Sequence, residues 1–171
     1  GRWPRARRVG PALARDCLGC GGGGSVRARG RTITAPDLVS FATLTGDFHP
    51  LPTDVEWAAE SAFNGRIAHG MLLLSYCVGL VPLDPDHVLA LRGFERVAFK
   101  RPVRIGDTIH VDGKLESKQE LDDASGLVVF SWKILNQRSE GVALIPAQRD
   151  AGTDGRIVMK MNSLVDQAVI D

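Results

Sequence analysis

The stretch FATLTGDFHPLPTDVEWAAESAFNGRIAHGMLLLSYCVGLV, from Phe41 to Val81, is the most informative part of the sequence. It joins a loop, GDFHP (46–50), to a segment from Arg66 to Val81 that is apolar almost all round. A helix that is apolar on every face is buried rather than laid on a surface. The carboxylate of Asp47 and the imidazole of His49 would lie beside that helix, which predicts a chemical site in a dry pocket.

The composition is that of an ordinary globular protein. The chain has 171 residues, of which 44% are hydrophobic and 24% charged, and this length favours one domain with a sizeable core. The net charge of +1 is unevenly spread, because residues 1–31 hold eight of the 21 basic residues and one acid, Asp16. We expect residues 1–30, rich in Arg and Gly, to form an irregular, solvated segment rather than a nucleic-acid interface, since aromatic residues are not interleaved with the charges.

The cysteines indicate a reducing compartment. Cys17, Cys20 and Cys77 are odd in number, so we expect a cytoplasmic protein without a disulfide framework. Cys17 and Cys20 have C-x-x-C spacing, but no second Cys or His pair follows at zinc-ligand distance. We therefore expect neither a metal nor a cofactor. The apolar run from Met71 to Val81 is too short to span a bilayer, so no membrane contact is expected.

Hydrophobic periodicity predicts an α+β fold. Thr34 is expected to cap a helix, with Asp37 in the capping-box position, and Gly46 to end that helix. The other predicted helices are 56–62, 66–81 and a terminal one over 163–169. The predicted strands are 26–33, 94–100, 108–118 and 127–135, with 142–145 and 157–161 as edge strands. A curved antiparallel sheet wrapped around the 66–81 helix satisfies this pattern, and a second copy would finish covering the helix.

Several short strings resemble the MaoC-like dehydratase family, which includes the (R)-specific enoyl-CoA hydratases and has the hotdog fold. They are IT (33–34), DLV (37–39), FA (41–42), LTGD (44–47), RIAHGM (66–71), FKRPV (99–103) and GDT (106–108). The resemblance covers about 105 residues, from 32 to 137. It implies a single hotdog domain over 31–171, with a curved antiparallel sheet around one long central helix.

The resemblance also implies site residues. The family signature is Asp, any residue, Asn, Pro, any residue, His, and its Asp and His hold the water that adds to a 2-enoyl thioester. Asp47 and Pro50 match the signature, whereas His49 stands at the Asn position and Pro52 at the final His position. Pro52 has no ionisable group and cannot replace an imidazole. The family's thioester carbonyl is polarised by a backbone N–H that maps to Gly70.

Two classes of function are therefore open. The first is a hydro-lyase that hydrates 2-enoyl-CoA or dehydrates 3-hydroxyacyl thioesters, with Asp47 as base, His49 assisting, and the Gly70 amide as donor to the enolate oxygen. The second is a catalytically silent hotdog subunit that binds an acyl thioester or supports an active partner, favoured by Pro52. A thioesterase has only the shared fold in its favour.

Each candidate side chain also has a purely structural role open to it. Asp47 could bind nearby backbone N–H groups, and His49 could make only a positioning hydrogen bond. His69 is expected to be structural. The expected partners are an acyl-CoA or acyl-carrier-protein thioester and further copies of the chain, as a homodimer or higher homo-oligomer, without nucleic acid. The basic residues that could meet coenzyme A phosphates, or only line a solvated strand edge, are Arg66, Lys100, Arg101 and Arg104.

Overall fold

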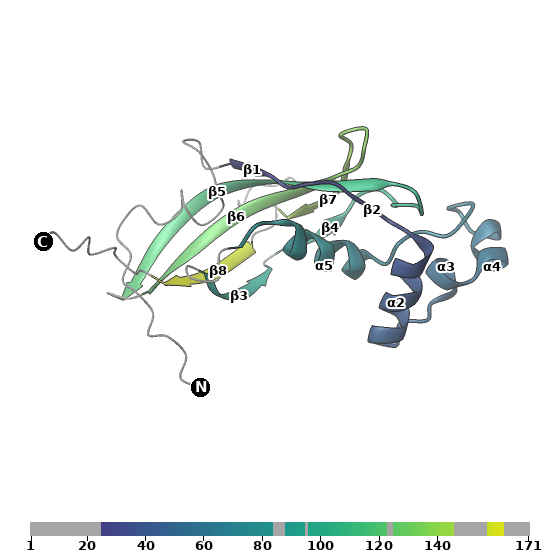
Figure 1. Cartoon of the computed structure of the whole chain (residues 1–171), viewed down its shortest axis with the longest axis horizontal. Helices are drawn as coiled ribbons and strands as arrows, with labels where there is room; N and C mark the ends of the chain where they lie inside the picture. The colour runs from purple at the N-terminus through teal and green to yellow at the C-terminus, as the bar shows by residue number, and fades with distance from the viewer. Residues whose placement is uncertain (1–24, 84–87, 95, 123–124, 146–156, 163–171) are drawn as a thin grey trace, which may run out of the picture.

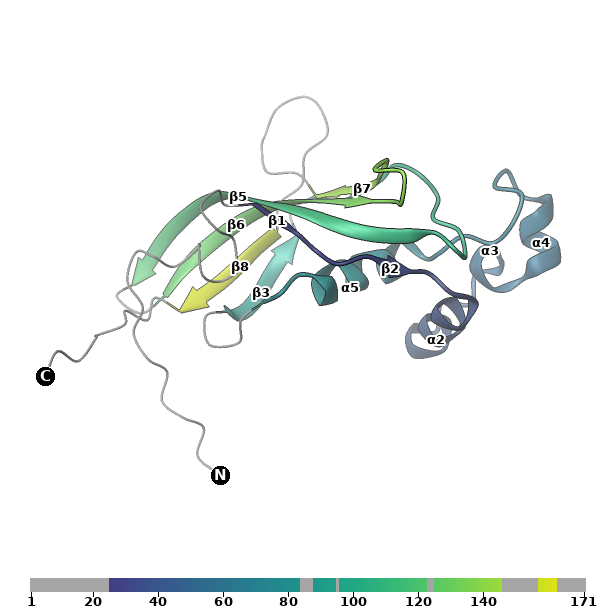
Figure 2. The same ribbon diagram turned by 45° about the horizontal axis from the view of Figure 1, so that its top comes forward.

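A curved antiparallel sheet with helices at one end and along its concave side forms the protein (Figures 1 and 2). The structure is a computed structural model, and it describes residues 25–83, 88–94, 96–122, 125–145 and 157–162. The helices are α2 (Ala35–Thr45), α3 (Pro50–Thr53), α4 (Val55–Glu60) and α5 (Gly70–Leu80). The strands are β1 (Ser25–Arg27), β2 (Arg31–Thr32), β3 (Val88–Phe94), β4 (Ala98–Phe99), β5 (Thr108–Asp122), β6 (Ser125–Leu135), β7 (Gly141–Ile145) and β8 (Ile157–Asn162).

The long β5–β6 hairpin is the centre of the sheet, and every described pairing is antiparallel. β1 and β2 pair with β5 on one side. On the other side β6 has two neighbours, since its first half pairs with β8 and its second half with β7. β8 in turn pairs with β3, and β7 with β4. This arrangement confirms the predicted α+β fold with one curved sheet.

Helix α2 begins and ends as its sequence predicts. The Asp37 carboxylate accepts hydrogen bonds from the backbone N–H and the hydroxyl of Thr34, at 2.7 and 2.8 Å. These bonds satisfy a backbone donor that the start of a helix leaves free. Gly46 adopts φ 75°, and its N–H donates to the Ala42 carbonyl at 2.8 Å. This left-handed residue turns the chain into the Asp47 loop.

Helix α5 begins four residues later than predicted, which corrects the 66–81 boundary. Ile67 forms an antiparallel bridge with Arg104, and the Ala68 N–H donates to the Val103 carbonyl at 2.8 Å. Residues 66–69 are therefore held against the chain that precedes β5, and the helix begins at Gly70.

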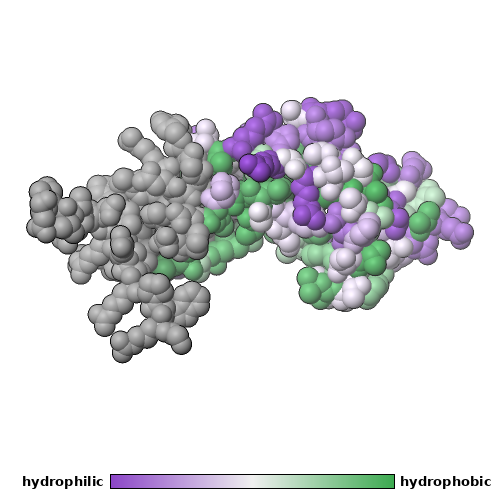
Figure 3. All heavy atoms as spheres, viewed as in Figure 1, coloured by the Kyte–Doolittle hydropathy of each residue, from purple (hydrophilic) through white to green (hydrophobic). Residues whose placement is uncertain are grey.

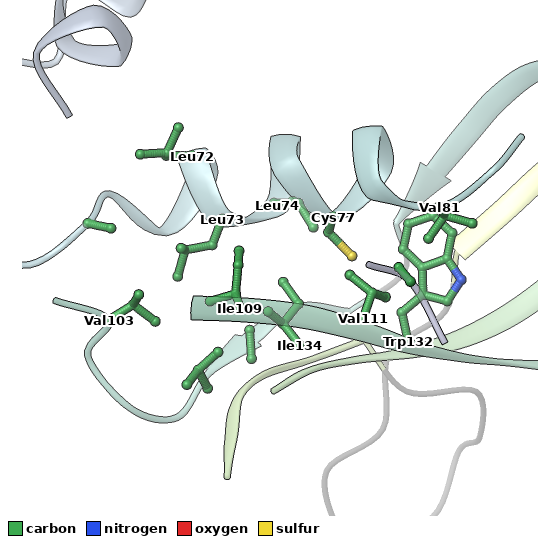
Figure 4. Packing of buried hydrophobic residues seen from close by; sticks show 14 of the residues in the cluster. Leu72, Leu73, Leu74, Cys77, Val81, Val103, Ile109, Val111, Trp132 and Ile134 are labelled. Carbon is green, nitrogen blue, oxygen red and sulfur yellow. The ribbon is translucent and has the colours of Figure 1, made fainter. Parts of the chain in front are cut away.

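Burial of α5 is also one-sided, contrary to the expectation from its apolar composition. The faces of α5 toward the sheet are buried, and they pack on apolar side chains of β5 and β6 (Figure 4). Met71, Ser75 and Gly79 recur every four residues, lie on one stripe, and are exposed. Met71 alone exposes 57% of its surface. The single chain thus leaves one stripe of this helix uncovered.

Other boundaries differ from the predictions. The segment predicted as one strand over 94–100 is divided between β3 and β4. The strands predicted as edges over 142–145 and 157–161 correspond to β7 and β8, and both are interior. Each pairs with the long β6 on one side and with β4 or β3 on the other. The strand predicted over 26–33 is present as two short strands, β1 and β2, and β1 lies in the last residues of the segment over 1–30 that is expected to be irregular. The predicted terminal helix over 163–169 and the Cys17–Cys20 pair lie outside the described residues.

Candidate functional site

The Asp47 loop follows α2 and holds its carboxylate near its own backbone. Asp47 is exposed in the single chain, and its Oδ1 accepts the backbone N–H of His49 at 3.3 Å. The backbone N–H of Asp47 donates to the Thr45 hydroxyl at 3.3 Å. The structural role considered for Asp47, a loop carboxylate that accepts backbone N–H groups, is therefore present in this geometry.

The His49 ring is turned toward α3 rather than toward the Asp47 carboxylate. His49 is the N-cap of α3, and its Nδ1 accepts the Leu51 N–H at 3.2 Å. Its ring also meets the edge of Trp57, with 5.7 Å between ring centroids. Since Nδ1 accepts, the neutral ring carries its proton on Nε2. Asp47 and His49 lie on one loop, but no hydrogen bond joins their side chains in this described part of the chain.

His69 connects the Asp47 loop to the start of α5. Its Nε2 lies 3.1 Å from the backbone oxygen of Asp47, and its ring packs on Phe41 at 5.1 Å between centroids. A carbonyl only accepts, so Nε2 carries the hydrogen. The ring is 6% exposed, and its Nδ1 has no hydrogen-bond partner among the described residues. The structure thus brings Asp47 next to the residue that precedes Gly70.

Gly70 opens α5 with unpaired backbone donors and an aromatic ring against it. No side chain in the described structure caps this helix, so the N–H groups of its first turn keep donor capacity. A Cβ placed on Gly70 would lie 2.8 Å from two ring carbons of Phe99. A side chain at residue 70 would therefore force the ring of Phe99 to move.

A cavity of about 360 Å³ adjoins Gly70. Small-molecule sites typically occupy 300–1,000 Å³ and are mostly apolar, and this cavity fits that description. Its lining comes from the turn before α5, from α5 itself, and from β4 and the segment after it: Phe63, Ile67, Ala68, Gly70, Leu73, Phe99, Lys100, Arg101, Pro102 and Val103. Asp47 and His49 are not among these lining residues.

Two of the four basic residues considered for phosphate binding line the cavity. They are Lys100 and Arg101, both exposed. Arg101 donates from Nη1 to the Gly141 carbonyl at 3.0 Å. Arg104 does not line the cavity, and it donates to the carbonyls of Phe63 and Asn64 in the turn before α5. Arg66 does not line the cavity.

Pro52, at the position of the family's histidine, is buried within the single turn of α3. The Asp54 N–H closes that turn on the Pro50 carbonyl at 2.8 Å. No described cluster of three His, Cys, Asp or Glu side chains is placed to hold a metal ion. Likewise, no helix in the described ranges has the length and apolar character needed to cross a membrane.

Some site residues were missed at the level of sequence. Phe63 lies in no motif, and Phe99 lies in the string FKRPV but had no role assigned to it. Both line the cavity, where the bridge between Ile67 and Arg104 brings their two segments together. His69 lies within a recognised string, but a hydrogen bond to a residue 22 positions away has no local signal.

Comparison with known proteins identifies the class to which this fold and site belong. The family model for the MaoC like domain matches residues 22–131, so the chain belongs to the MaoC-like dehydratase family and has its hotdog fold. Protein MaoC of Klebsiella aerogenes is 42% identical over 90 residues, which is 52% of this chain and 27% of that protein. The (R)-specific enoyl-CoA hydratase of Aeromonas caviae is 34% identical over 86 residues, 50% of this chain and 64% of that protein.

A solved structure extends the similarity over most of the chain. The monoamine oxidase regulatory protein from Archaeoglobus fulgius superposes with a TM-score of 0.73 at 34% identity, covering 88% of this chain and 97% of that one. The chain matches less than two thirds of the length of the Klebsiella and Aeromonas proteins.

Proposed function

We propose that the chain is a hydro-lyase that reversibly hydrates 2-enoyl-CoA thioesters and dehydrates 3-hydroxyacyl-CoA thioesters. The observation that supports it best is the hydrogen bond from His69 to the Asp47 backbone, which holds the acidic loop beside the donor end of α5. The Aeromonas relative carries the name of such an enzyme.

The proposed roles follow from the chemistry of hydration. Asp47 removes a proton from water while the water oxygen bonds to C3 of the enoyl thioester. Negative charge then moves onto the thioester oxygen, where the Gly70 N–H donates to it. The proton held by the Asp47 carboxyl group is finally delivered to C2, which restores the carboxylate and the thioester carbonyl. His49 assists, since its Nε2 keeps a hydrogen to donate while Nδ1 is engaged by Leu51.

A catalytically silent subunit is the second proposal, and two observations favour it. Pro52 is buried where the family places its catalytic histidine. The His49 ring caps α3 instead of pairing with the Asp47 carboxylate. Such a subunit would bind an acyl thioester or support an active partner chain.

The hydration of crotonyl-CoA separates the two proposals, because loss of the conjugated double bond lowers ultraviolet absorbance. A hydro-lyase turns over crotonyl-CoA as the isolated chain, and Asp47→Ala and His49→Ala both slow it. An inert wild type together with an active Pro52→His variant supports the silent subunit. If the wild type is active and both alanine variants keep its full rate, the assigned roles are wrong.

The remaining features of the proposal concern carrier, compartment and cofactor. We propose coenzyme A or acyl carrier protein as the carrier, with Lys100 and Arg101 at the cavity as the cations nearest to its phosphates. The proposed chemistry uses acid–base and amide groups of the chain and requires no metal or bound cofactor. The cytoplasm is the proposed compartment, because the odd number of cysteines does not suit a disulfide framework.

A homodimer is proposed from the surfaces that the single chain leaves exposed. Hydrophobic residues lie at the surface over the helical end and along the sheet (Figure 3). Among the described strands, β3 pairs on one side only, and its free edge carries exposed Leu89 and Leu91. Exposed apolar edges are prone to pair with another strand.

Light scattering of the purified chain tests this proposal. A dimer has twice the 18.4 kDa mass of the chain, about 37 kDa. Leu91→Lys, which places a charge on the β3 edge, should shift the mass toward the monomer. A wild-type monomer across micromolar concentrations contradicts the proposal.

A further inference from the structure

The ring of Phe99 rests directly on the start of α5. Its three closest ring carbons lie 2.8, 2.8 and 3.1 Å from the point where a Cβ of residue 70 would stand. A Cβ at that point would overlap the ring, so the ring fills the space that a side chain of residue 70 would occupy. The ring therefore forms the wall of the cavity that faces Gly70.

We infer that Phe99 is a specificity-determining residue, whose ring limits the size of the acyl group that the cavity admits beside Gly70. This inference rests on the proposed function, since it concerns the same thioester site. It adds to that function a residue that selects among substrates, distinct from Asp47 and His49.

The backbone around Phe99 is held independently of its ring. Phe99 pairs with Ala143 in the β4–β7 ladder, and the next residue, Lys100, donates its N–H to the Val142 carbonyl at 2.8 Å. The side chain is 48% exposed, so its ring covers Gly70 without being part of the closed core. Truncating this ring is expected to widen the cavity while the strand keeps its place.

The other large apolar residues of the lining do not have this position. Leu73 is 3% exposed and belongs to the core beneath the cavity, so its truncation would weaken the fold. Phe63 lies in the turn between α4 and α5, and its carbonyl accepts a hydrogen bond from Arg104. The three atoms nearest to a Cβ built on Gly70 all belong to the ring of Phe99.

Binding and turnover of an acyl-length series test the inference. Affinities of butyryl-, hexanoyl-, octanoyl- and decanoyl-CoA are measured by calorimetry for wild type, Phe99→Ala and Phe99→Leu. The same lengths are measured as 2-enoyl substrates for kcat/KM. Leu121→Ala is the control, because Leu121 is a similarly exposed apolar residue, 44% against 48%, on β5 and outside the cavity lining.

The expected result is a shift in preference toward longer chains. One methylene in an apolar pocket is worth up to 200-fold, so a ring-sized space should raise the decanoyl-to-butyryl affinity ratio by about tenfold or more in Phe99→Ala. Phe99→Leu should fall between it and wild type, and Leu121→Ala should match wild type. Equal ratios in wild type and Phe99→Ala overturn the inference.

The affinity series keeps the inference separate from the proposed function. If the wild type binds acyl-CoA but turns over no enoyl-CoA, the hydro-lyase proposal is wrong. The decanoyl-to-butyryl affinity ratios still test the role of Phe99 in that case. If the wild type binds no acyl-CoA, both the hydro-lyase proposal and the inference about Phe99 are wrong. Gly70→Ala is an independent check on the contact between Phe99 and Gly70. It should lower the free energy of unfolding of the wild type, and lower it by less in the Phe99→Ala background. Equal losses of unfolding free energy in the two backgrounds contradict the contact.

Discussion

The Nε2 atom of His69 lies 3.1 Å from the backbone oxygen of Asp47, across 22 positions of the sequence. This bond joins the acidic loop to the residue that precedes Gly70. A carboxylate can act on a bound thioester only if its loop and the amide donor keep a constant separation, and His69 supplies that constraint.

Replacing His69 should therefore affect catalysis more than binding. His69→Ala is expected to lower kcat by about 10- to 100-fold with little change in KM, because small displacements of a reacting group cost up to 100-fold. His69→Gln should recover part of that loss, since its amide N–H can donate to the same carbonyl. Steady-state rates with crotonyl-CoA give both constants.

The control for His69 is His110→Gln, on β5, which should keep the wild-type rate. An alanine variant with full kcat would show that the hydrogen bond does not position Asp47. A glutamine variant as slow as alanine would show that a donor to this carbonyl is not sufficient.

A second polar cluster joins β2, α2 and α5. The Asp37 carboxylate accepts from Arg31 at 3.0 Å and from the Tyr76 hydroxyl at 2.7 Å, in addition to Thr34. Burial acts to raise the pKa of Asp37, but the hydrogen bonds from Tyr76, Thr34 and Arg31 outweigh it and lower that pKa from 3.8 to about 2. The ionised carboxylate is thus stabilised by folding.

This pKa sets a pH dependence of stability. A depressed pKa contributes stability that is complete above the unfolded pKa of 3.8 and is lost as the pH falls through about 2. Asp37→Asn should lower the free energy of unfolding by about 2 kcal/mol at pH 7, and by about half as much at pH 3. Urea unfolding of both proteins between pH 7 and 3 measures the difference. A difference that stays constant over this range contradicts the account.

Cys77 should be unreactive in the folded protein. It lies on the buried side of α5 and is fully buried, and burial raises the pKa of its thiol far above the usual range, so the reactive thiolate is suppressed. Peptide mapping after iodoacetamide treatment should find Cys77 unlabelled in buffer and labelled in guanidinium. Equal labelling under both conditions would mean that α5 opens readily.

Local signals in the sequence were sufficient for the parts of the fold that depend on neighbouring residues. The caps of α2 depend on Thr34, Asp37 and Gly46, which lie at or near its ends, and the structure has all three in place. The strand predicted over 127–135 lies within β6. These features require no knowledge of distant contacts.

Features that depend on distant pairing could not be predicted from local pattern. The start of α5 moves to Gly70 because Ile67 pairs with Arg104, 37 positions away. The positions of β7 and β8 inside the sheet depend on the length of β6, with which both strands pair. The alternation of apolar and polar residues in the sequence does not reveal that length. The orientation of His49 depends on its capping of α3, so the sequence alone left its two roles open.

The proposed hydration requires Asp47 to activate water beside the donor end of α5. Crotonyl-CoA hydration by wild type and Asp47→Asn tests it most directly, because asparagine keeps the shape of the side chain and removes its basicity. We expect turnover by the wild type and a fall in kcat of about 100-fold or more in Asp47→Asn, with the unfolding free energy little changed. Equal rates in the two proteins would contradict the account.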